Sequence, residues 1–246
     1  MPPQLLTSVR SNGSLFVGSG AAAKRPIHAL LVASAIAISA EIETQKGQML
    51  AALLGANARP AAAMFTSLTS SVAQSASLRA VVDVTLSGEQ LDIFEAVMRL
   101  CDIALKDRNR FAHWVWGTVH ELEDALAFID PEAMIDYSVK KHDRRFHVFG
   151  APGILQGLSS DDFDYSRVWI YRQKDLIEAV GSLQQACENI SALRFVAGRS
   201  DSQADQLYQE IKTRPEIASE LARLNKKRET RPDARSQRRR KGRSEK

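Results

Sequence analysis

Three side chains that together can bind and cleave a phosphodiester stand within six residues: Arg108, Asn109 and His113, in the segment Arg-Asn-Arg-Phe-Ala-His. An arginine guanidinium binds two phosphate oxygens at once and keeps its charge at every working pH. A histidine exchanges protons close to neutral pH because its unperturbed pKa is about 6.5. The asparagine amide can donate to phosphate or orient the histidine. The spacing R-N-x-x-x-H therefore indicates metal-independent RNA cleavage, in which a 2′-hydroxyl attacks the neighbouring phosphate.

We expect this segment to begin a helix for which Asp107 is the N-cap. On a helix of 3.6 residues per turn, Asn109 and His113 are about 40° apart and share a face, whereas Arg108 is about 140° from His113. Arg108 reaches the other two only from the mouth of the helix, where free N–H groups and the helix dipole also favour an anion. His120 lies seven residues after His113, falls on the same predicted face and is a second candidate proton carrier.

A purely structural interpretation of the same residues is open. Arg108 would then pair with Asp107 or Asp102, and His113 would pack inside a helical bundle. The two interpretations differ in one observable, which is whether the motif side chains reach solvent together or lie dispersed and buried.

A metal site is not predicted. His142, Asp143 and His147 stand in an irregular basic stretch and lack the spacing of a ligand set. We expect that stretch to be a solvated loop or a contact for nucleic acid.

The motif resembles that of the HEPN superfamily, an all-helical group whose R-x(4–6)-H motif usually has a polar residue directly after the arginine. The aromatic segment His-Trp-Val-Trp-Gly that follows is similar to that of bacterial members. The resemblance covers about residues 27–128 and, more loosely, 175–196. It implies a metal-independent endoribonuclease of toxin or defence type that needs no cofactor, with Arg108, Asn109 and His113 as its catalytic residues.

The resemblance further implies a homodimer in which two motifs face one cleft. Transesterification uses a base and an acid, and a two-fold dimer, the commonest oligomer, would supply both from two copies of His113. An acidic residue from an earlier helix commonly supports the arginine in such proteins, and Glu41 or Glu43 would take that place here. RNA would be the substrate, and an antitoxin protein would be a further partner.

The charge of the chain is concentrated at its C-terminus. Residues 226–246 contain eleven Lys or Arg and three acidic residues, a net charge of +8, whereas the remaining 22 basic and 26 acidic residues sum to −4. The densest run is Arg238, Arg239, Arg240 and Lys241. Such a tail is typical of nucleic-acid-binding segments and also of solubilising, disordered ends. The alternative function is therefore a non-catalytic helical adaptor or nucleic-acid-binding protein that uses this tail.

The bulk composition is that of a globular cytoplasmic protein. Apolar residues make up 44% of the 246 residues, enough for a substantial core. Cys101 and Cys187 stand in apolar helical patterns and are interpreted as buried free thiols. The most apolar run, 27–40, falls short of the roughly 18 to 20 residues of a membrane span, and we expect a core helix there and no membrane contact.

Apolar periodicity predicts a mainly α protein, a helical bundle with a small antiparallel β insertion. We expect a flexible N-terminus over 1–26, a helical domain over 27–198, a polar helical extension over 199–225 with a break at Pro215, and a disordered basic tail over 226–246. Within the domain, a capping box at Ser87–Gln90 begins one helix, a further helix runs from 108 to about 128, and another spans 175–196. β-forming residues place the strands within 134–149 and 168–171, which gives the insertion near 134–171.

Removal of residues 226–246 should weaken binding of single-stranded RNA at low salt without sequence preference. Each phosphate that the tail neutralises contributes about −0.7 to the slope of log affinity against log salt concentration on a single strand. A titration of intact and truncated protein at two salt concentrations measures both quantities. Equal affinities and equal slopes would assign the tail a solubilising role only.

Overall fold

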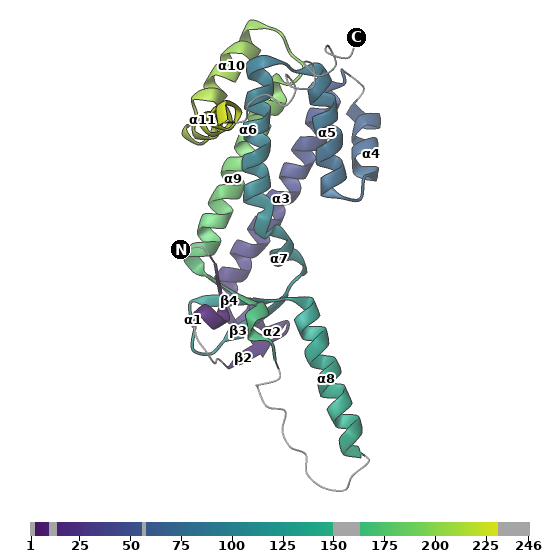
Figure 1. The fold of residues 1–246 in the computed structure, drawn as a ribbon, viewed down its shortest axis with the longest axis vertical. Coiled ribbons are helices and arrows are strands. Elements are labelled where there is room, and N and C mark those ends of the chain that lie inside the picture. Colours follow the sequence, from purple (N-terminus) through teal and green to yellow (C-terminus); the bar gives the residue numbers. More distant parts are fainter. Residues whose placement is uncertain (1–2, 10–13, 56–57, 150–162, 231–246) are drawn as a thin grey trace, which may run out of the picture. The chain divides into compact units, whose positions relative to one another are not determined.

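The computed structural model describes residues 3–9, 14–55, 58–149 and 163–230 (Figure 1). The protein is 76% helical with a small five-stranded antiparallel sheet, so the predicted mainly α fold with a minor β component is confirmed. The chain divides into two compact units, which we call the sheet unit (1–40 and 104–185) and the helical unit (41–103 and 186–246). Two long helices, α3 (Pro26–Leu53) and α9 (Gln173–Val196), contribute residues to both units.

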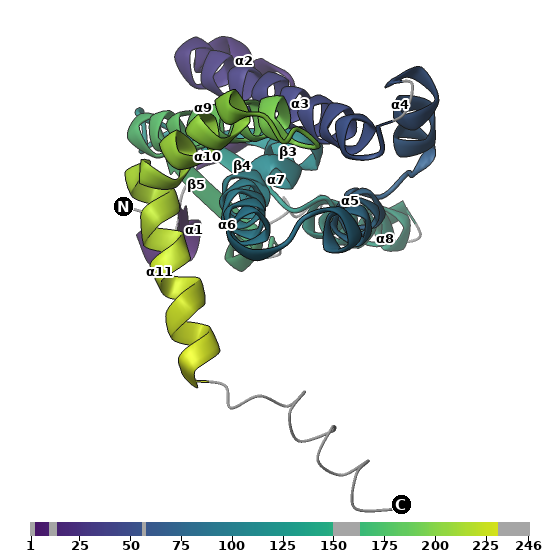
Figure 2. The same ribbon diagram turned by 90° about the horizontal axis from the view of Figure 1, so that it is seen from above.

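The remaining elements belong to one unit each. The sheet unit contains β1 (Gln4–Leu5), α1 (Leu6–Val9), β2 (Leu15–Val17), α2 (Gly20–Lys24), the 3₁₀ turn η1 (Leu105–Asp107), α7 (Arg108–His113), β3 (Val115–Val119), β4 (Ala125–Ile129), α8 (Pro131–Phe149), the 3₁₀ turn η3 (Tyr165–Arg167) and β5 (Val168–Arg172). The helical unit contains α4 (Ala58–Ser67), α5 (Ser71–Thr85), α6 (Gly88–Ala104), α10 (Ser202–Thr213) and α11 (Pro215–Thr230) (Figure 2).

The sheet has the strand order β1-β5-β4-β3-β2, and every neighbouring pair is antiparallel. β3 and β4 form a hairpin in which Val115 lies opposite Ile129 and Gly117 opposite Ala127. β4 pairs with β5 along all five of its residues. Because it is paired on both sides and buried throughout, β4 is the central strand on which the unit is assembled.

The two faces of β4 carry different side chains, as the two-residue repeat of a strand requires. Ala125, Ala127 and Ile129 belong to an aliphatic cluster. The other buried members of that cluster are Leu6, Val119, Val168 and Ile170. Phe128, on the opposite face of β4, belongs to an aromatic group with Phe111, Trp116 and Tyr171.

Two sequence-based predictions fail in the sheet unit. The helix expected to run to residue 128 ends at His113, and two strands follow it. The segment Val-Trp-Gly-Thr-Val is rich in β-branched and aromatic residues, and Ala-Leu-Ala-Phe-Ile is a short continuous apolar run that suits a strand buried on both faces. The N-terminal residues, expected to be loose, supply the strands β1 and β2.

The strands expected within 134–149 are also wrong, because this segment is the helix α8. Pro131 stands at its first position, where the missing N–H costs nothing. The Asp130 carboxylate accepts a hydrogen bond from the backbone N–H of Glu132 at 3.0 Å. These two features favour a helix start, and the segment is helical although β-forming residues follow. The expected strand at 168–171 is confirmed as β5.

The core of the helical unit includes the apolar side of α6, which buries Phe94, Val97, Met98 and Cys101. Apolar residues of the neighbouring helices are not all buried, since Met64 and Val72 are exposed. α5 and α6 are joined by Arg79, which forms ion pairs with Asp102 at 3.0 Å and Glu95 at 3.8 Å. Gly47 lies against Phe65, and a Cβ atom built on that glycine would be 3.1 Å from the ring.

Both cysteines are free and buried, in agreement with the prediction. Burial raises the pKa of the Cys101 thiol to about 12 and that of the Cys187 thiol to about 11. Glu41 adds to the shift of Cys187 through its charge and a hydrogen bond. Both thiols are therefore protonated at neutral pH and behave as small apolar side chains.

Helix ends agree only in part with the predictions. The break at Pro215 is confirmed, since α10 ends at Thr213 and α11 begins at Pro215. The helix predicted to begin at Ser87–Gln90 is confirmed as α6, which begins at Gly88. Within the described residues, however, Ser87 and Gln90 form no capping hydrogen bond, and Glu89 pairs with Lys212.

The first five residues of the basic segment are helical, since α11 continues to Thr230 and Arg228 forms an ion pair with Asp92 at 2.5 Å. A truncation that leaves this helix intact therefore begins after Thr230. The run Arg238–Lys241 lies outside the described residues.

α3 is long and apolar enough, by length and composition alone, to cross a membrane. The expectation that no segment reaches this length is therefore wrong, because the helix does not end near Glu41 but continues to Leu53. Core helices of water-soluble proteins satisfy the same criterion, and Val32, Ile42 and Met49 are fully buried here.

Replacing Gly117 with alanine should lower the free energy of unfolding by about 1 to 3 kcal/mol, the usual cost of overpacking. A Cβ atom at this position would lie 2.8 Å from Ile129 Cδ1 and 2.9 Å from the backbone oxygen of Phe16, so β2 would have to move. Gly181→Ala is the matched control, because nothing lies within 4 Å of a Cβ atom there. In a helix this change should stabilise by about 0.5 to 1 kcal/mol. Thermal and urea unfolding measure the stability of both variants. An unchanged free energy of unfolding for Gly117→Ala would contradict the close packing of β2 against β3 at this glycine.

Candidate active site on helix α7

The orientation of α7 is fixed by Phe111, which is 2% exposed. Its ring lies 5.4 Å from that of Phe128 and 5.2 Å from that of Tyr171, both in tilted or edge-on contacts. On a helix, residues two positions before and two positions after Phe111 are each rotated by about 160° from it. Asn109 and His113 occupy those positions, and both are exposed. Burial of one aromatic ring therefore directs these two polar side chains outward.

The side-chain polar groups of Asn109 and His113 have no partner among the described residues. Neither forms a side-chain hydrogen bond or an ion pair within the part of the chain that the structure describes. Their separation of one helical turn places both side chains on the same side of α7. The amide and the imidazole thus remain available to a ligand.

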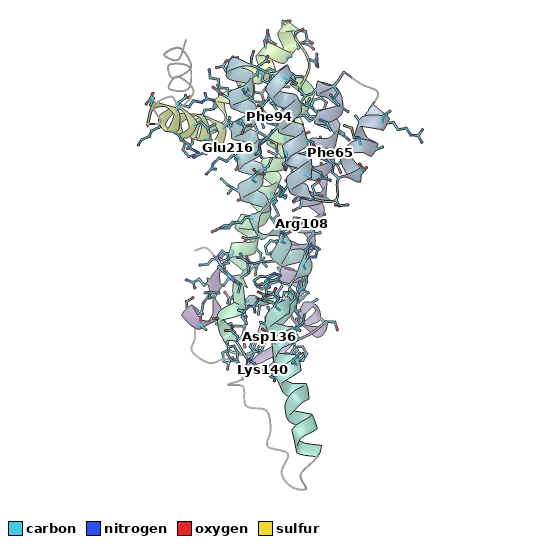
Figure 3. The ribbon with its side chains drawn as sticks, turned by 45° about the vertical axis from the view of Figure 1, so that its right-hand side comes forward. Phe65, Phe94, Arg108, Asp136, Lys140 and Glu216 are labelled. Atoms are coloured by element: carbon cyan, nitrogen blue, oxygen red, sulfur yellow. The ribbon has the colours of Figure 1, made fainter. Side chains whose placement is uncertain are left out.

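Arg108, the first residue of α7, is half-buried (Figure 3). Its Nε atom is buried and has no hydrogen-bond partner among the described residues. The acids considered as its structural partners are otherwise engaged, since Asp107 accepts from Arg110 at 2.7 Å and Asp102 accepts from Arg79 at 3.0 Å. Asp107 stands at the N-cap position of α7, as expected, but its side chain makes no capping hydrogen bond.

Arg110 is the residue of the motif that the sequence analysis left without a role. Its Nη1 atom donates to Asp107 and, at 3.1 Å, to the hydroxyl of Tyr171. Its guanidinium carbon lies 4.0 Å from the ring centre of Trp169 and 5.5 Å from that of Trp114. The sequence could have predicted two of these contacts. Asp107 and Trp114 stand three residues before and four residues after Arg110, and residues at these spacings are neighbours on a helix.

The Tyr171 hydroxyl completes this arrangement as a neutral group. Burial raises its pKa above the ordinary value, and the charge of Asp107 acts in the same direction, against the hydrogen bond from Arg110. It is therefore protonated at neutral pH and accepts from the arginine. Arg110 thus serves to hold α7 on the sheet, and its charge is already compensated by Asp107.

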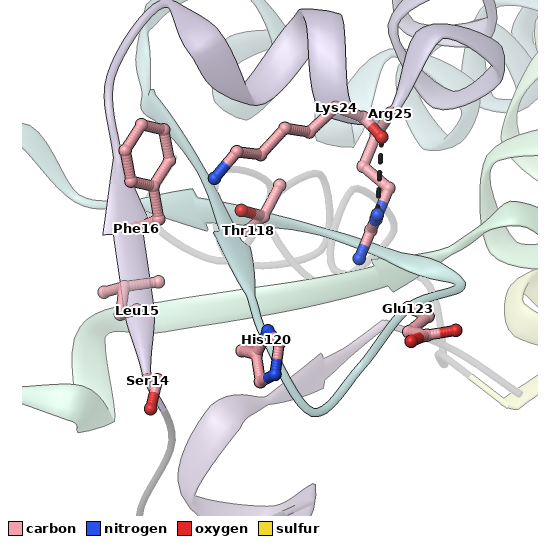
Figure 4. Close-up of a pocket in the computed structure, with 8 residues that line it drawn as sticks. All are labelled: Ser14, Leu15, Phe16, Lys24, Arg25, Thr118, His120 and Glu123. Carbon is pink, nitrogen blue, oxygen red and sulfur yellow. Dashed lines mark hydrogen bonds between the residues drawn. The ribbon is translucent and has the colours of Figure 1, made fainter.

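The other predicted site residues belong to elements other than α7. His120 was expected on the same helical face as His113, but it follows strand β3 and donates its backbone N–H to the oxygen of Ser14 at 3.1 Å. Its side chain lines a groove that contains no motif residue (Figure 4). Glu41 belongs to the helical unit, where its side chain interacts with Cys187. His142, Asp143 and His147 lie on α8, so the loop expected there is wrong.

Among the described residues, no group of three or more His, Cys, Asp or Glu side chains is arranged to hold a metal ion. Comparison of the chain with protein families, with curated proteins and with solved structures finds no match.

Arg110→Ala should destabilise the protein by about 2 to 4 kcal/mol, through loss of a charged hydrogen bond and of a partly desolvated cation–π contact. Arg172→Ala is the control: its ion pair with Asp124, at 3.3 Å, is largely exposed and should contribute only about 0 to 1 kcal/mol. Urea unfolding at neutral pH measures both. Equal losses for the two variants would show that Arg110 does not anchor α7.

Proposed function

We propose that the protein is a metal-independent endoribonuclease in which Arg108, Asn109 and His113 act on the phosphodiester. The observation that carries this proposal is the outward, unengaged placement of Asn109 and His113 on one face of α7. Both groups are therefore accessible to a substrate phosphate. The resemblance of the motif to that of HEPN ribonucleases supports the same reaction.

Each residue has a distinct part in the proposed reaction. His113 takes the proton from the 2′-hydroxyl or delivers one to the departing 5′-oxygen. Arg108 stabilises the negative charge that grows on the phosphate, and its unpaired buried Nε–H is a donor that a bound anion would satisfy. Asn109 donates from the same face as the histidine and orients the phosphate. The product is a 2′,3′-cyclic phosphate with a free 5′-hydroxyl.

We propose that the active form is a homodimer, because one motif supplies a single histidine for two proton transfers. A two-fold axis beside α7 would bring a second His113 to the same phosphate. Light scattering should therefore report a dimer at concentrations where RNA is cleaved. A monomer with full cleavage activity would refute this arrangement.

His113→Ala should reduce RNA cleavage by about 10²- to 10⁴-fold, the range for a positioned acid–base group. The assay is incubation of purified protein with mixed RNA in the presence of EDTA. His113 is exposed, so the thermal unfolding midpoint should not change. His113→Gln, which keeps a polar side chain but transfers no proton, should be equally inactive.

His120→Ala is the matched control, because this exposed histidine lines a different surface and should leave cleavage intact. Wild-type protein that binds RNA without cutting it would support the alternative, a binding protein that uses its basic C-terminus. Equal losses in the His113 and His120 variants would contradict the assignment to α7.

A further inference from the structure

A groove of about 870 Å³ opens in the sheet unit, and no residue of the α7 motif is among its lining residues (Figure 4). Its lining comes from strand β2, the C-terminal end of α2, and strand β3 with the turn that follows it. The lining residues are Ser14, Leu15, Phe16, Lys24, Arg25, Thr118, His120 and Glu123. The volume lies within the range of roughly 300 to 1,000 Å³ of sites that hold small molecules.

Lys24, Arg25 and His120 form no ion pair with any carboxylate that the structure describes. Within the described residues, the Lys24 ammonium forms no ion pair, and its contact is with the ring of Phe16, 3.7 Å from the ring centre. The imidazole of His120 likewise has no side-chain partner in that part of the chain. Glu123 is the one carboxylate among the lining residues, so the fixed charges there favour an anion.

Arg25 adds a charge that is held in place. Its guanidinium donates to three backbone oxygens: Ala125 at 3.3 Å, Leu122 at 3.4 Å and Lys24 at 3.3 Å. Backbone carbonyls orient the group without cancelling its charge. Such a fixed cation stabilises an anion without losing side-chain freedom when the anion binds.

The groove also presents an aromatic surface. Phe16 is a large apolar side chain with 45% of its area exposed on the edge strand β2. Aromatic rings stack with nucleobases, with a contribution of about 1 to 3 kcal/mol per base. Thr118, which is only 4% exposed, lines the same groove and brings a hydroxyl to it.

From this combination we infer that the groove binds a nucleoside monophosphate, with its phosphate at Lys24, Arg25 and His120 and its base against Phe16. Two cations and an imidazole match a phosphate ligand better than a ligand that carries a single carboxylate. The groove is lined by none of the residues of the α7 motif. Binding of a nucleotide there is therefore independent of the proposed ribonuclease activity.

Isothermal titration with adenosine 5′-monophosphate, inorganic phosphate and adenosine tests the inference on the full chain. The monophosphate should bind at least tenfold more tightly than either fragment, because it uses both parts of the groove. Lys24→Ala should weaken its binding roughly tenfold, the effect of one charged hydrogen bond. Glu123→Gln should strengthen its binding, because it removes the negative charge from the lining.

Three controls make the result specific. Lys174→Ala removes an exposed lysine of the sheet unit outside the groove and should leave the affinity unchanged. Phe16→Leu keeps an apolar side chain without a ring and should lower the affinity for the monophosphate but not for phosphate. His113→Ala should bind the monophosphate as the wild type does.

Absence of binding at millimolar monophosphate would overturn the inference. Equal affinities for the monophosphate and for inorganic phosphate would also overturn it, since the base would then contribute nothing. Equal losses in the Lys24 and Lys174 variants would show general charge attraction instead of a site.

Discussion

The contact between Phe111 and Phe128 determines which side of α7 faces solvent. Phe128 lies in the central strand of the sheet, and Phe111 is the only fully buried side chain of the six-residue helix α7. A helix this short has little stability of its own, so its orientation depends on what it packs against. Once the Phe111 ring is buried between Phe128 and Tyr171, the helical repeat alone places Asn109 and His113 on the outer side.

The arginines near α7 illustrate how the same charge serves different purposes. Arg110 is used by the fold, since it pairs with Asp107, contacts Tyr171 and lies against Trp169. Arg108, by contrast, forms no ion pair within the described residues, and its buried Nε atom has no hydrogen-bond partner there. One arginine therefore anchors α7, and the charge of the other is available to an anion.

The charges of the groove beside β2 are also placed by contacts of the fold. Arg25 is bound by backbone oxygens near the β3–β4 turn, and the buried His28 contacts the backbone oxygen of Asp124 in the same turn at 2.7 Å. These contacts attach the start of α3 to the sheet and leave no carboxylate paired with Arg25 or Lys24 in the described residues. Gly117 permits the close approach of β2 that brings Phe16 to the groove.

The sequence by itself determined the mainly α character, the buried thiols, the apolar side of α6, and the helix boundaries at Pro215 and near Val196. It did so because these features depend on local signals: the 3.6-residue apolar repeat, proline, and residues near a helix end. It also identified Arg108, Asn109 and His113 as the residues whose chemistry is unusual for a helix start.

Only the tertiary structure decided the conformation of residues 115–129, the β3–β4 hairpin. This segment carries mixed signals, and the energy of pairing β4 with two neighbours outweighs its helical pattern. Strand pairing also decided that His120 follows β3 and shares no helical face with His113. Side-chain pairing and strand register join residues far apart in the sequence, as for Arg110 and Tyr171, and no local pattern encodes them.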